Sequence, residues 1–167
     1  MKEKKPAQVI ATKVADKNNV VHTTIGGGGG YCERVCPECP WRKRNSGNFP
    51  AKAFLHSVHT SYDMAQETFG CHMSGTDTPR TCAGFLLRGA DDNLSVRIAR
   101  ATGRIGYPEP EDGLHESYKA MAIANGVKPS NPRLKDCMPE ARDFKERGRA
   151  KWLKELAKIN RRIRKKT

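Results

Sequence analysis

The sequence predicts a small, irregular, mainly α domain that is stabilised by a metal and followed by a long basic C-terminal helix. Hydrophobic residues make up only 37% of the 167 residues and aromatic residues 7%, so the chain has little apolar surface for a large core. The six cysteines could supply a metal centre, which adds folding free energy where apolar burial is short. Apolar residues recur at helical rather than strand spacing in several segments.

Residues 1–30 are predicted to form a flexible basic tail that ends in a glycine tether. Residues 1–24 are polar and rich in lysine, without sustained periodicity. Residues 9–14 are compatible with a short strand, but their surroundings favour disorder. The run Gly26–Gly30 lacks the lysine and hydroxyl residue of a phosphate-binding loop and carries a heavy ordering cost, which indicates a tether.

Residues 31–103 are predicted to be the cysteine-rich metal-binding domain, with two helices. The segment NFP at 48–50 is typical of a helix start. The apolar stripe that follows at i, i+3, i+4 and i+7 consists of Ala51, Phe54, Leu55 and Val58. A second helix is expected from about Asp91 to Gly103. Residues 104–138 are predicted to be a loop with a short helix over 115–125.

Residues 139–167 are predicted to form a basic amphipathic C-terminal helix. They hold twelve Lys or Arg against four Asp or Glu, a balance of +8 out of +13 for the whole chain. Its apolar side carries Trp152, Leu156, Ile159 and Ile163. The predicted nucleic-acid-binding residues are Arg147, Arg149, Lys151, Lys154, Lys158, Arg161, Arg162, Arg164, Lys165 and Lys166.

Four cysteines are predicted to bind one metal centre: Cys36, Cys39, Cys71 and Cys82. A CxxC turn lets two thiolates converge on one ion, and each of its cysteines is followed by a proline that restrains the backbone. Zinc is the metal that four cysteines bind most often. An iron–sulfur cluster such as [4Fe-4S] accommodates widely spaced single cysteines better, so the sequence favours zinc and a cluster about equally. His72 and Arg42 are candidates for hydrogen bonding to the ligands, and Cys32 is a spare thiol.

Other readings of the same residues are weaker. Four inert thiols without metal remain an alternative. Cys32-x3-Cys36-x2-Cys39 matches the radical-SAM spacing, but the chain lacks the strand–helix alternation of that barrel. A zinc finger drawn with His56 and His59 departs from the usual spacing. CPEC is also typical of a thioredoxin-type dithiol, but this sequence lacks the alternating strands and helices that surround such a dithiol.

At CPECPWRK, TFGCH, TCAGFLL and NLSVRIAR the chain resembles a small cysteine-rich domain family of bacteria and phages whose function is unknown. That family is marked by CxxCPxR, then F-x-CH, then CAG, and the resemblance covers about residues 26–100. Its motif falls on Cys36, Cys39, Pro40, Arg42, Cys71, His72, Cys82, Ala83 and Gly84. The resemblance implies a site on these residues and a phage or prophage accessory gene as the origin, but no reaction. A distant similarity to WhiB-like regulators, which hold an iron–sulfur cluster, adds slight support for a cluster and for transcription.

The charge predicts a partner that is a polyanion, DNA or RNA. A regulator that binds an acidic host protein and an iron–sulfur redox protein are the alternatives, and the C-terminal helix could also form a homodimer. No acid–base pair or catalytic triad stands out, so the sequence does not favour an enzyme. The N-terminus lacks a secretory apolar region and no apolar run approaches about 20 residues, which predicts a cytoplasmic protein in a bacterial or phage-infected host and no membrane.

Overall fold

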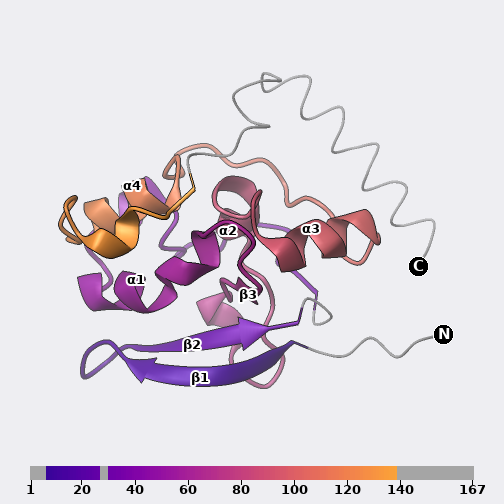
Figure 1. Ribbon diagram of the computed structural model, residues 1–167, viewed down its shortest axis with the longest axis horizontal. Helices are drawn as coiled ribbons and strands as arrows, with labels where there is room; N and C mark the ends of the chain where they lie inside the picture. Colours follow the sequence, from indigo (N-terminus) through magenta and orange to yellow (C-terminus); the bar gives the residue numbers. More distant parts are fainter. Residues whose placement is uncertain (1–6, 27–29, 139–167) are drawn as a thin grey trace.

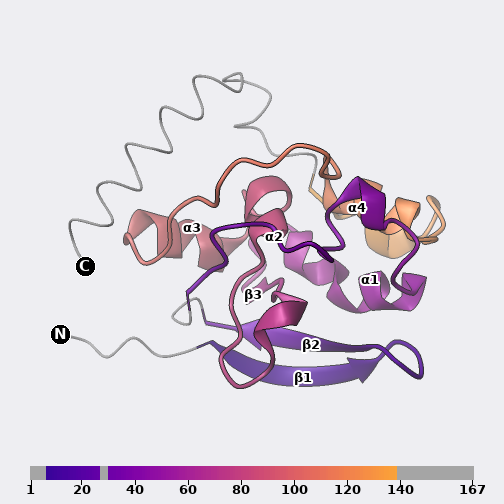
Figure 2. The same ribbon diagram turned by 180° about the vertical axis from the view of Figure 1, so that it is seen from behind.

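The computed structural model describes residues 7–26 and 30–138, in which a three-stranded antiparallel sheet lies beside four short α-helices (Figure 1). The strands, in their spatial order, are β1 (Gln8–Val14), β2 (Val20–Ile25) and β3 (Glu67–Thr68). The helices are α1 (Ala51–Ser57), α2 (Ala83–Arg88), α3 (Leu94–Ala101) and α4 (Tyr118–Ala124). Figure 2 shows the same arrangement from behind, with the helices on one side of the β1–β2 hairpin.

The prediction of a mainly α fold is wrong, because the structure contains an antiparallel sheet. β1 and β2 lie in the segment that was expected to be a flexible tail, and they pair from Gln8 opposite Ile25 to Val14 opposite Val20. Five of the six residues of β2 (VVHTTI) are β-branched, which favours a strand even though two of them are polar. The predicted basic helix over 139–167 lies outside the described residues.

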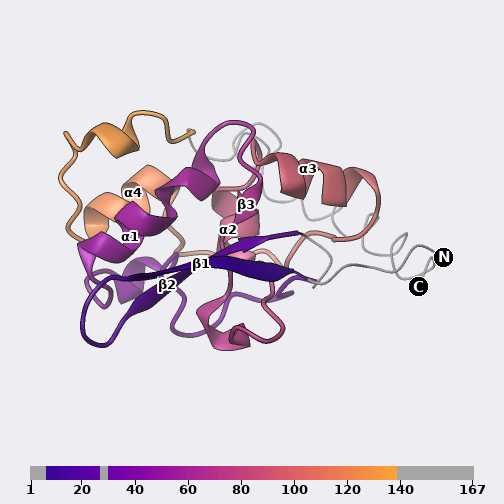
Figure 3. The same cartoon turned by 60° about the horizontal axis from the view of Figure 1, so that its bottom comes forward.

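The hairpin is closed by a tight turn and docks through β2. Oδ1 of Asp16 accepts hydrogen bonds from the backbone N–H groups of Asn18 (2.8 Å) and Asn19 (2.7 Å), an arrangement that fixes the turn. The buried Thr24 hydroxyl donates to the Thr68 carbonyl oxygen of β3 at 2.8 Å. Figure 3 shows the hairpin crossing α1, where a ring nitrogen of His56 lies 3.2 Å from the Val14 carbonyl oxygen.

The three helices predicted within residues 31–138 are confirmed as α1, α3 and α4. The Asn93 side chain caps α3 by accepting from the Val96 N–H, and the Ser117 hydroxyl caps α4 in the same way from the Ala120 N–H. Helix α2 was not predicted. It has only six residues and all of them are buried, so its sequence (AGFLLR) carries no amphipathic period.

The core is centred on Trp41, which is fully buried and lies two residues after Cys39. Its ring meets those of Tyr118, Phe69 and Phe85 at centroid distances of 5.9, 6.0 and 6.3 Å. Two glycines of the α2 region make room for it: a Cβ on Gly84 would lie 2.6 Å from the Trp41 Cβ, and one on Gly89 would lie 2.5 Å from the far edge of the ring. The CAG motif therefore has a packing reason for its glycine.

Among the helices in residues 7–26 and 30–138, none is long and apolar enough to cross a membrane.

Candidate metal centre

Three of the cysteines are carried by extended segments that lie side by side. Thr81 forms a parallel bridge with Tyr31 and an antiparallel bridge with Gly70, so it stands between them. The Cys32 N–H donates to the Thr81 carbonyl at 3.0 Å. The Cys71 N–H donates to Arg80 O at 2.8 Å, and the Cys82 N–H donates to Phe69 O at 2.9 Å. These bonds bring Cys32, Cys71 and Cys82 together from distant parts of the sequence.

The CxxC turn carries Cys36 and Cys39 and is braced by side chains that follow it. The Cys39 N–H donates to the Cys36 carbonyl at 3.2 Å, which closes the turn. The Asn45 amide donates to the carbonyls of Pro37 and Cys39, both at 2.9 Å. The Arg42 guanidinium donates to the carbonyls of Cys36 (2.9 Å) and Val35 (2.7 Å). The carbonyls of Val35 and Pro37 thereby gain side-chain donors, and those of Cys36 and Cys39 each accept a side-chain bond in addition to a backbone bond.

The sulfurs of five cysteines form a chain of contacts. Sγ of Cys39 and Sγ of Cys82 are 3.6 Å apart, although the two residues are 43 positions apart in the sequence. The Cys36 thiol lies close enough to Cys39 and to Cys71 to affect their acidity, and Cys71 is related to Cys32 in the same way. The order of contacts is therefore Cys82, Cys39, Cys36, Cys71 and Cys32.

These contacts alter the acidity of the thiols. Interactions with Cys32 and Cys36 lower the pKa of Cys71. The pKa of Cys32 is raised chiefly by Cys71, and that of Cys36 is raised by Cys39 and then by Cys71. At Cys39 the hydrogen bond from Cys36 acts to lower the pKa, but the bond to Cys82 together with burial outweighs it and raises the pKa. The first thiolate of the group therefore forms at Cys71, and later ones have to form beside an existing negative charge.

Backbone N–H groups point at two of the sulfurs. The Trp41 N–H donates to the Cys39 sulfur, and the Met73 N–H donates to the Cys71 sulfur, in each case from two residues further along the chain. Both bonds lower the pKa of the thiol that accepts them because they favour its ionised form. Ionised thiols are the form in which cysteine binds a metal.

The donor set fits a thiophilic metal by its chemistry, but the side chains do not already surround one point. Within residues 7–26 and 30–138, no group of three or more His, Cys, Asp or Glu side chains is placed so that it could hold a metal ion as it stands. The sulfurs follow one another in a line of pairwise contacts instead. A shared ion would require rotation of cysteine side chains toward a common centre.

The residues expected to support the site have different surroundings. Arg42 forms an ion pair of 2.6 Å with Glu111 and braces the CxxC turn, so much of its charge is matched by a carboxylate. His72 packs edge-on against Phe49 at a centroid distance of 5.8 Å, and its Nε2 lies 3.9 Å from a Glu38 carboxylate oxygen. His56 faces the hairpin, as described above. The predicted cations of the C-terminal segment lie outside the described residues.

Cys32 was predicted to be a spare thiol, and the structure distinguishes it from Cys137. Cys32 belongs to the sulfur chain through Cys71. Cys137 instead bridges to Tyr62, and its sulfur is 4.0 Å from the Arg133 carbonyl oxygen. Sequence spacing gave no sign of this difference, because the bridges of Thr81 decide which thiol approaches Cys71.

The chain belongs to the family of unknown function DUF6283, whose family model matches residues 31–138. The match begins just before Cys32 and ends just after Cys137, so it contains the whole sulfur chain, whereas the β1–β2 hairpin precedes it. The resemblance expected from the cysteine motifs to a small family of unknown function is thereby confirmed. Neither the curated proteins nor the solved structures contain a match to this chain.

Proposed function

We propose that the chain is a zinc-binding module in which Cys36, Cys39, Cys71 and Cys82 hold one ion. The observation that carries the proposal is the 3.6 Å separation between the sulfurs of Cys39 and Cys82. Zinc–sulfur bonds of about 2.3 Å in a tetrahedron put any two sulfurs about 3.8 Å apart. This pair therefore already has the spacing of two corners of such a site.

The same distance favours a single ion over an iron–sulfur cluster. In a [4Fe-4S] cluster each cysteine binds a different iron, so two ligand sulfurs are separated by two Fe–S bonds and an iron–iron edge. A single tetrahedral ion joins them through one metal atom. The short distance between the Cys39 and Cys82 sulfurs therefore matches a single ion. Metal analysis that finds iron would indicate a cluster instead.

The proposed zinc is structural. Four thiolates fill a tetrahedral zinc ion and leave no position for water or substrate. The segments that carry these cysteines have little regular structure, apart from isolated bridges and short turns. An ion shared among them would replace the apolar burial that such segments lack.

The test is metal analysis of the full chain purified without oxygen, together with the visible spectrum after cobalt substitution. The expected result is one zinc per chain and the absorption of a tetrahedral cobalt–thiolate site. Serine at Cys36, Cys39, Cys71 or Cys82 should each lower the metal affinity at least about tenfold, whereas Cys137→Ser should not. A brown protein with stoichiometric iron, or four serine variants that all keep full metal affinity, would contradict the proposal.

Cys32→Ser decides which thiol is the fourth ligand. Cys32 and Cys82 occupy the two ends of the sulfur chain, and a tetrahedral ion accepts only one of them together with the three central cysteines. We assign this place to Cys82, because it is buried against Cys39, whereas Cys32 is half-buried. Loss of metal from Cys32→Ser with retention by Cys82→Ser would reverse the assignment.

We further propose that the module associates with nucleic acid through residues 139–167. Residues 1–6 contribute +2 and residues 139–167 contribute +8 to the net charge of +13, which leaves +3 for residues 7–138. The attraction for polyanions therefore depends mainly on residues 139–167. Several phosphate contacts by these residues would make the binding steeply salt-dependent.

The nucleic-acid proposal is tested by the mobility shift of labelled DNA and RNA at low salt. Replacement of the ten predicted cations of residues 147–166 by glutamine should abolish the shift and leave the cobalt spectrum unchanged. The matched control replaces exposed Lys and Arg residues of the folded part, Arg34 and Lys52, and should keep the shift. Unchanged binding by the ten-residue variant, or co-purification with one acidic protein after nuclease treatment, would contradict it.

A further inference from the structure

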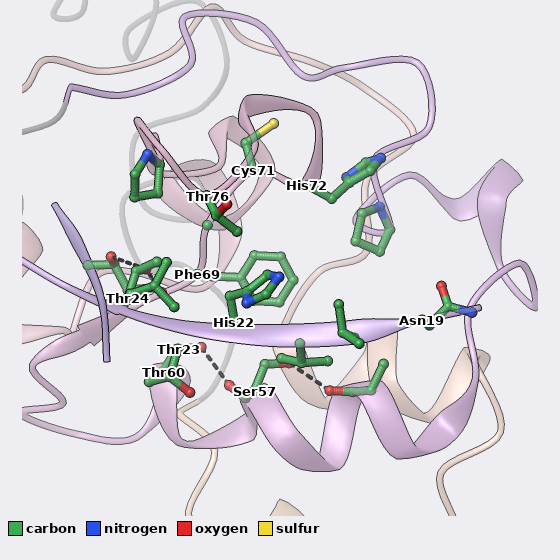
Figure 4. Close-up of a pocket in the computed structure, with 18 of the residues that line it drawn as sticks. Asn19, His22, Thr23, Thr24, Ser57, Thr60, Phe69, Cys71, His72 and Thr76 are labelled. Atoms are coloured by element: carbon green, nitrogen blue, oxygen red, sulfur yellow. Dashed lines mark hydrogen bonds between the residues drawn. The ribbon is translucent and has the colours of Figure 1, made fainter. Parts of the chain in front are cut away.

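A cavity of about 350 Å³ lies between the β1–β2 hairpin and the family domain. Its walls come from β2, from α1 and the turn after it, and from the segment that follows β3. Figure 4 shows Cys71 and His72 on one side of β2, and Ser57 and Thr60 on the other. The volume falls at the lower end of the range of about 300–1,000 Å³ that is usual for small-molecule sites.

The lining of this cavity is largely aromatic and, among the described residues, the Cys71 thiol is its one acidic group. Among the described residues that line it there is no Asp, Glu, Lys or Arg. Three phenylalanines, three histidines and a group of threonine hydroxyls take part, and they are Phe49, Phe54, Phe69, His22, His59, His72, Thr23, Thr24, Thr60, Thr68 and Thr76. Such walls offer ring faces for stacking and neutral hydrogen-bonding atoms, but no partner for a charge.

The imidazoles supply the polar contacts that a ligand could use. Nδ1 of His22 is 2.8 Å from the Thr12 hydroxyl, which leaves Nε2 as the other hydrogen-bonding atom of this ring. Burial lowers the pKa of His59, so that ring is neutral at pH 7. A neutral imidazole both donates and accepts a hydrogen bond, which suits a heterocycle with a ring nitrogen.

We propose that this cavity binds a small, uncharged, planar heteroaromatic molecule of about the size of a bicyclic ring. Aromatic walls favour a planar ligand, and the absence of charged residues among the described residues of the lining disfavours an ionised one. The hairpin that forms one wall precedes the family match, so the site is a joint product of the hairpin and the family domain. Cys71, a proposed zinc ligand, is one of the lining residues, and the remaining walls come from residues that take no part in the proposed zinc site.

The experiment is an NMR titration of the isotope-labelled full chain with three matched probes at pH 7.5. Benzimidazole is neutral and has a ring nitrogen that accepts, indole has the same shape without that acceptor, and benzimidazole-5-carboxylate adds a negative charge. Benzimidazole should give saturable shifts at His22, Thr23 and Phe69. Indole should bind several-fold more weakly, and the carboxylate at least about tenfold more weakly, because a buried carboxylate has no partner there.

Two substitutions on α1 test the location. Ala53 lines the cavity and is half-buried, whereas its neighbour Lys52 is exposed and does not line it. Ala53→Leu should fill part of the space and weaken benzimidazole binding at least about tenfold, and Lys52→Leu should leave it unchanged. Benzimidazole that fails to bind at millimolar concentration, carboxylate that binds equally well, or an Ala53→Leu variant with full affinity and wild-type backbone spectra would each overturn the proposal.

Discussion

The sulfur-bearing segments and the β1–β2 hairpin differ in how each is held to the molecule. The sulfur-bearing segments enter the interior: Cys39 and Trp41 are fully buried, and Cys71 and Cys82 are nearly so. The hairpin is anchored mainly along β2, while Ile10, Val14 and Val20 remain 53%, 60% and 53% exposed. The hairpin has regular hydrogen bonds with little burial, and the sulfur-bearing segments have burial with few regular hydrogen bonds. Side-chain chemistry should therefore dominate the stability of the sulfur-bearing segments, and backbone pairing should dominate that of the hairpin.

The largest effect is expected where a sulfur is removed from the buried group. Cys39→Ser should lower the free energy of unfolding of the zinc-loaded chain by about 4 kcal/mol, the value for a ligand present at a thousand times its Kd. Thermal unfolding with and without a chelator measures this loss, and the chelator should have no further effect on the variant. Cys137→Ser is the control and should change stability by less than about 0.5 kcal/mol. A chelator-insensitive wild type would show that no metal supports this region.

A smaller effect is expected where α2 packs against Trp41. Gly84→Ala should destabilise the protein by about 1–3 kcal/mol, because the added Cβ would lie 2.6 Å from the Trp41 Cβ and would force the ring or the helix to move. Gly70→Ala is the matched control, since its Cβ would meet Thr24 at 3.8 Å, an ordinary contact. Chemical denaturation of both variants measures the difference. Equal stabilities would mean that Trp41 is less tightly held than its distances indicate.

The hairpin should respond to the loss of one buried hydrogen bond. Thr24→Val keeps the branched shape but removes the donor to the Thr68 carbonyl oxygen, at a cost of about 1 kcal/mol. Thr12→Val removes a hydroxyl from an exposed pair with His22 on the same hairpin and should cost about 0.5 kcal/mol or less. Hydrogen exchange of the β2 amides would report the change locally. Equal losses of stability in Thr12→Val and Thr24→Val would contradict this prediction.

The smallest effect concerns pH. His115 is buried, with its Nε2 3.0 Å from the Ser46 hydroxyl, and burial, aided by the charge of Lys43, lowers its pKa. The unfolded chain therefore takes up a proton at about pH 6.5 and the folded chain only at a lower pH, so stability falls as pH drops below about 6.5. His115→Gln should make the decline between pH 7.5 and 5.5 shallower. Unfolding free energies at the two pH values measure it, and an unchanged slope would exclude this residue as a cause.

Much of the helical part could be predicted from the sequence, because α1, α3 and α4 each carry an apolar period or a capping residue. The hairpin was missed since its strands are half-exposed, and half-exposed strands need few apolar residues. α2 was missed for the opposite reason: complete burial removes the contrast between its faces.

The candidate site was predictable only in part. The motifs pointed to Cys36, Cys39, Cys71 and Cys82, and their convergence on an ion stays a prediction. The contact between Cys32 and Cys71 depends on the bridges that Thr81 makes to two distant segments. Pairing of that kind leaves no local trace in composition or spacing. The cavity likewise depends on the hairpin, which was not expected to fold.

The position of Trp41 has a consequence for the order of assembly during synthesis. A ribosome releases Cys39 and this indole ring well before the segment with Cys82, Gly84 and Gly89 has been made. Until that segment emerges, the ring cannot pack against the two glycines and the Cys39 sulfur lacks its contact with Cys82. Any ion captured earlier would be held by an incomplete set of ligands, so we expect final loading to follow translation of α2.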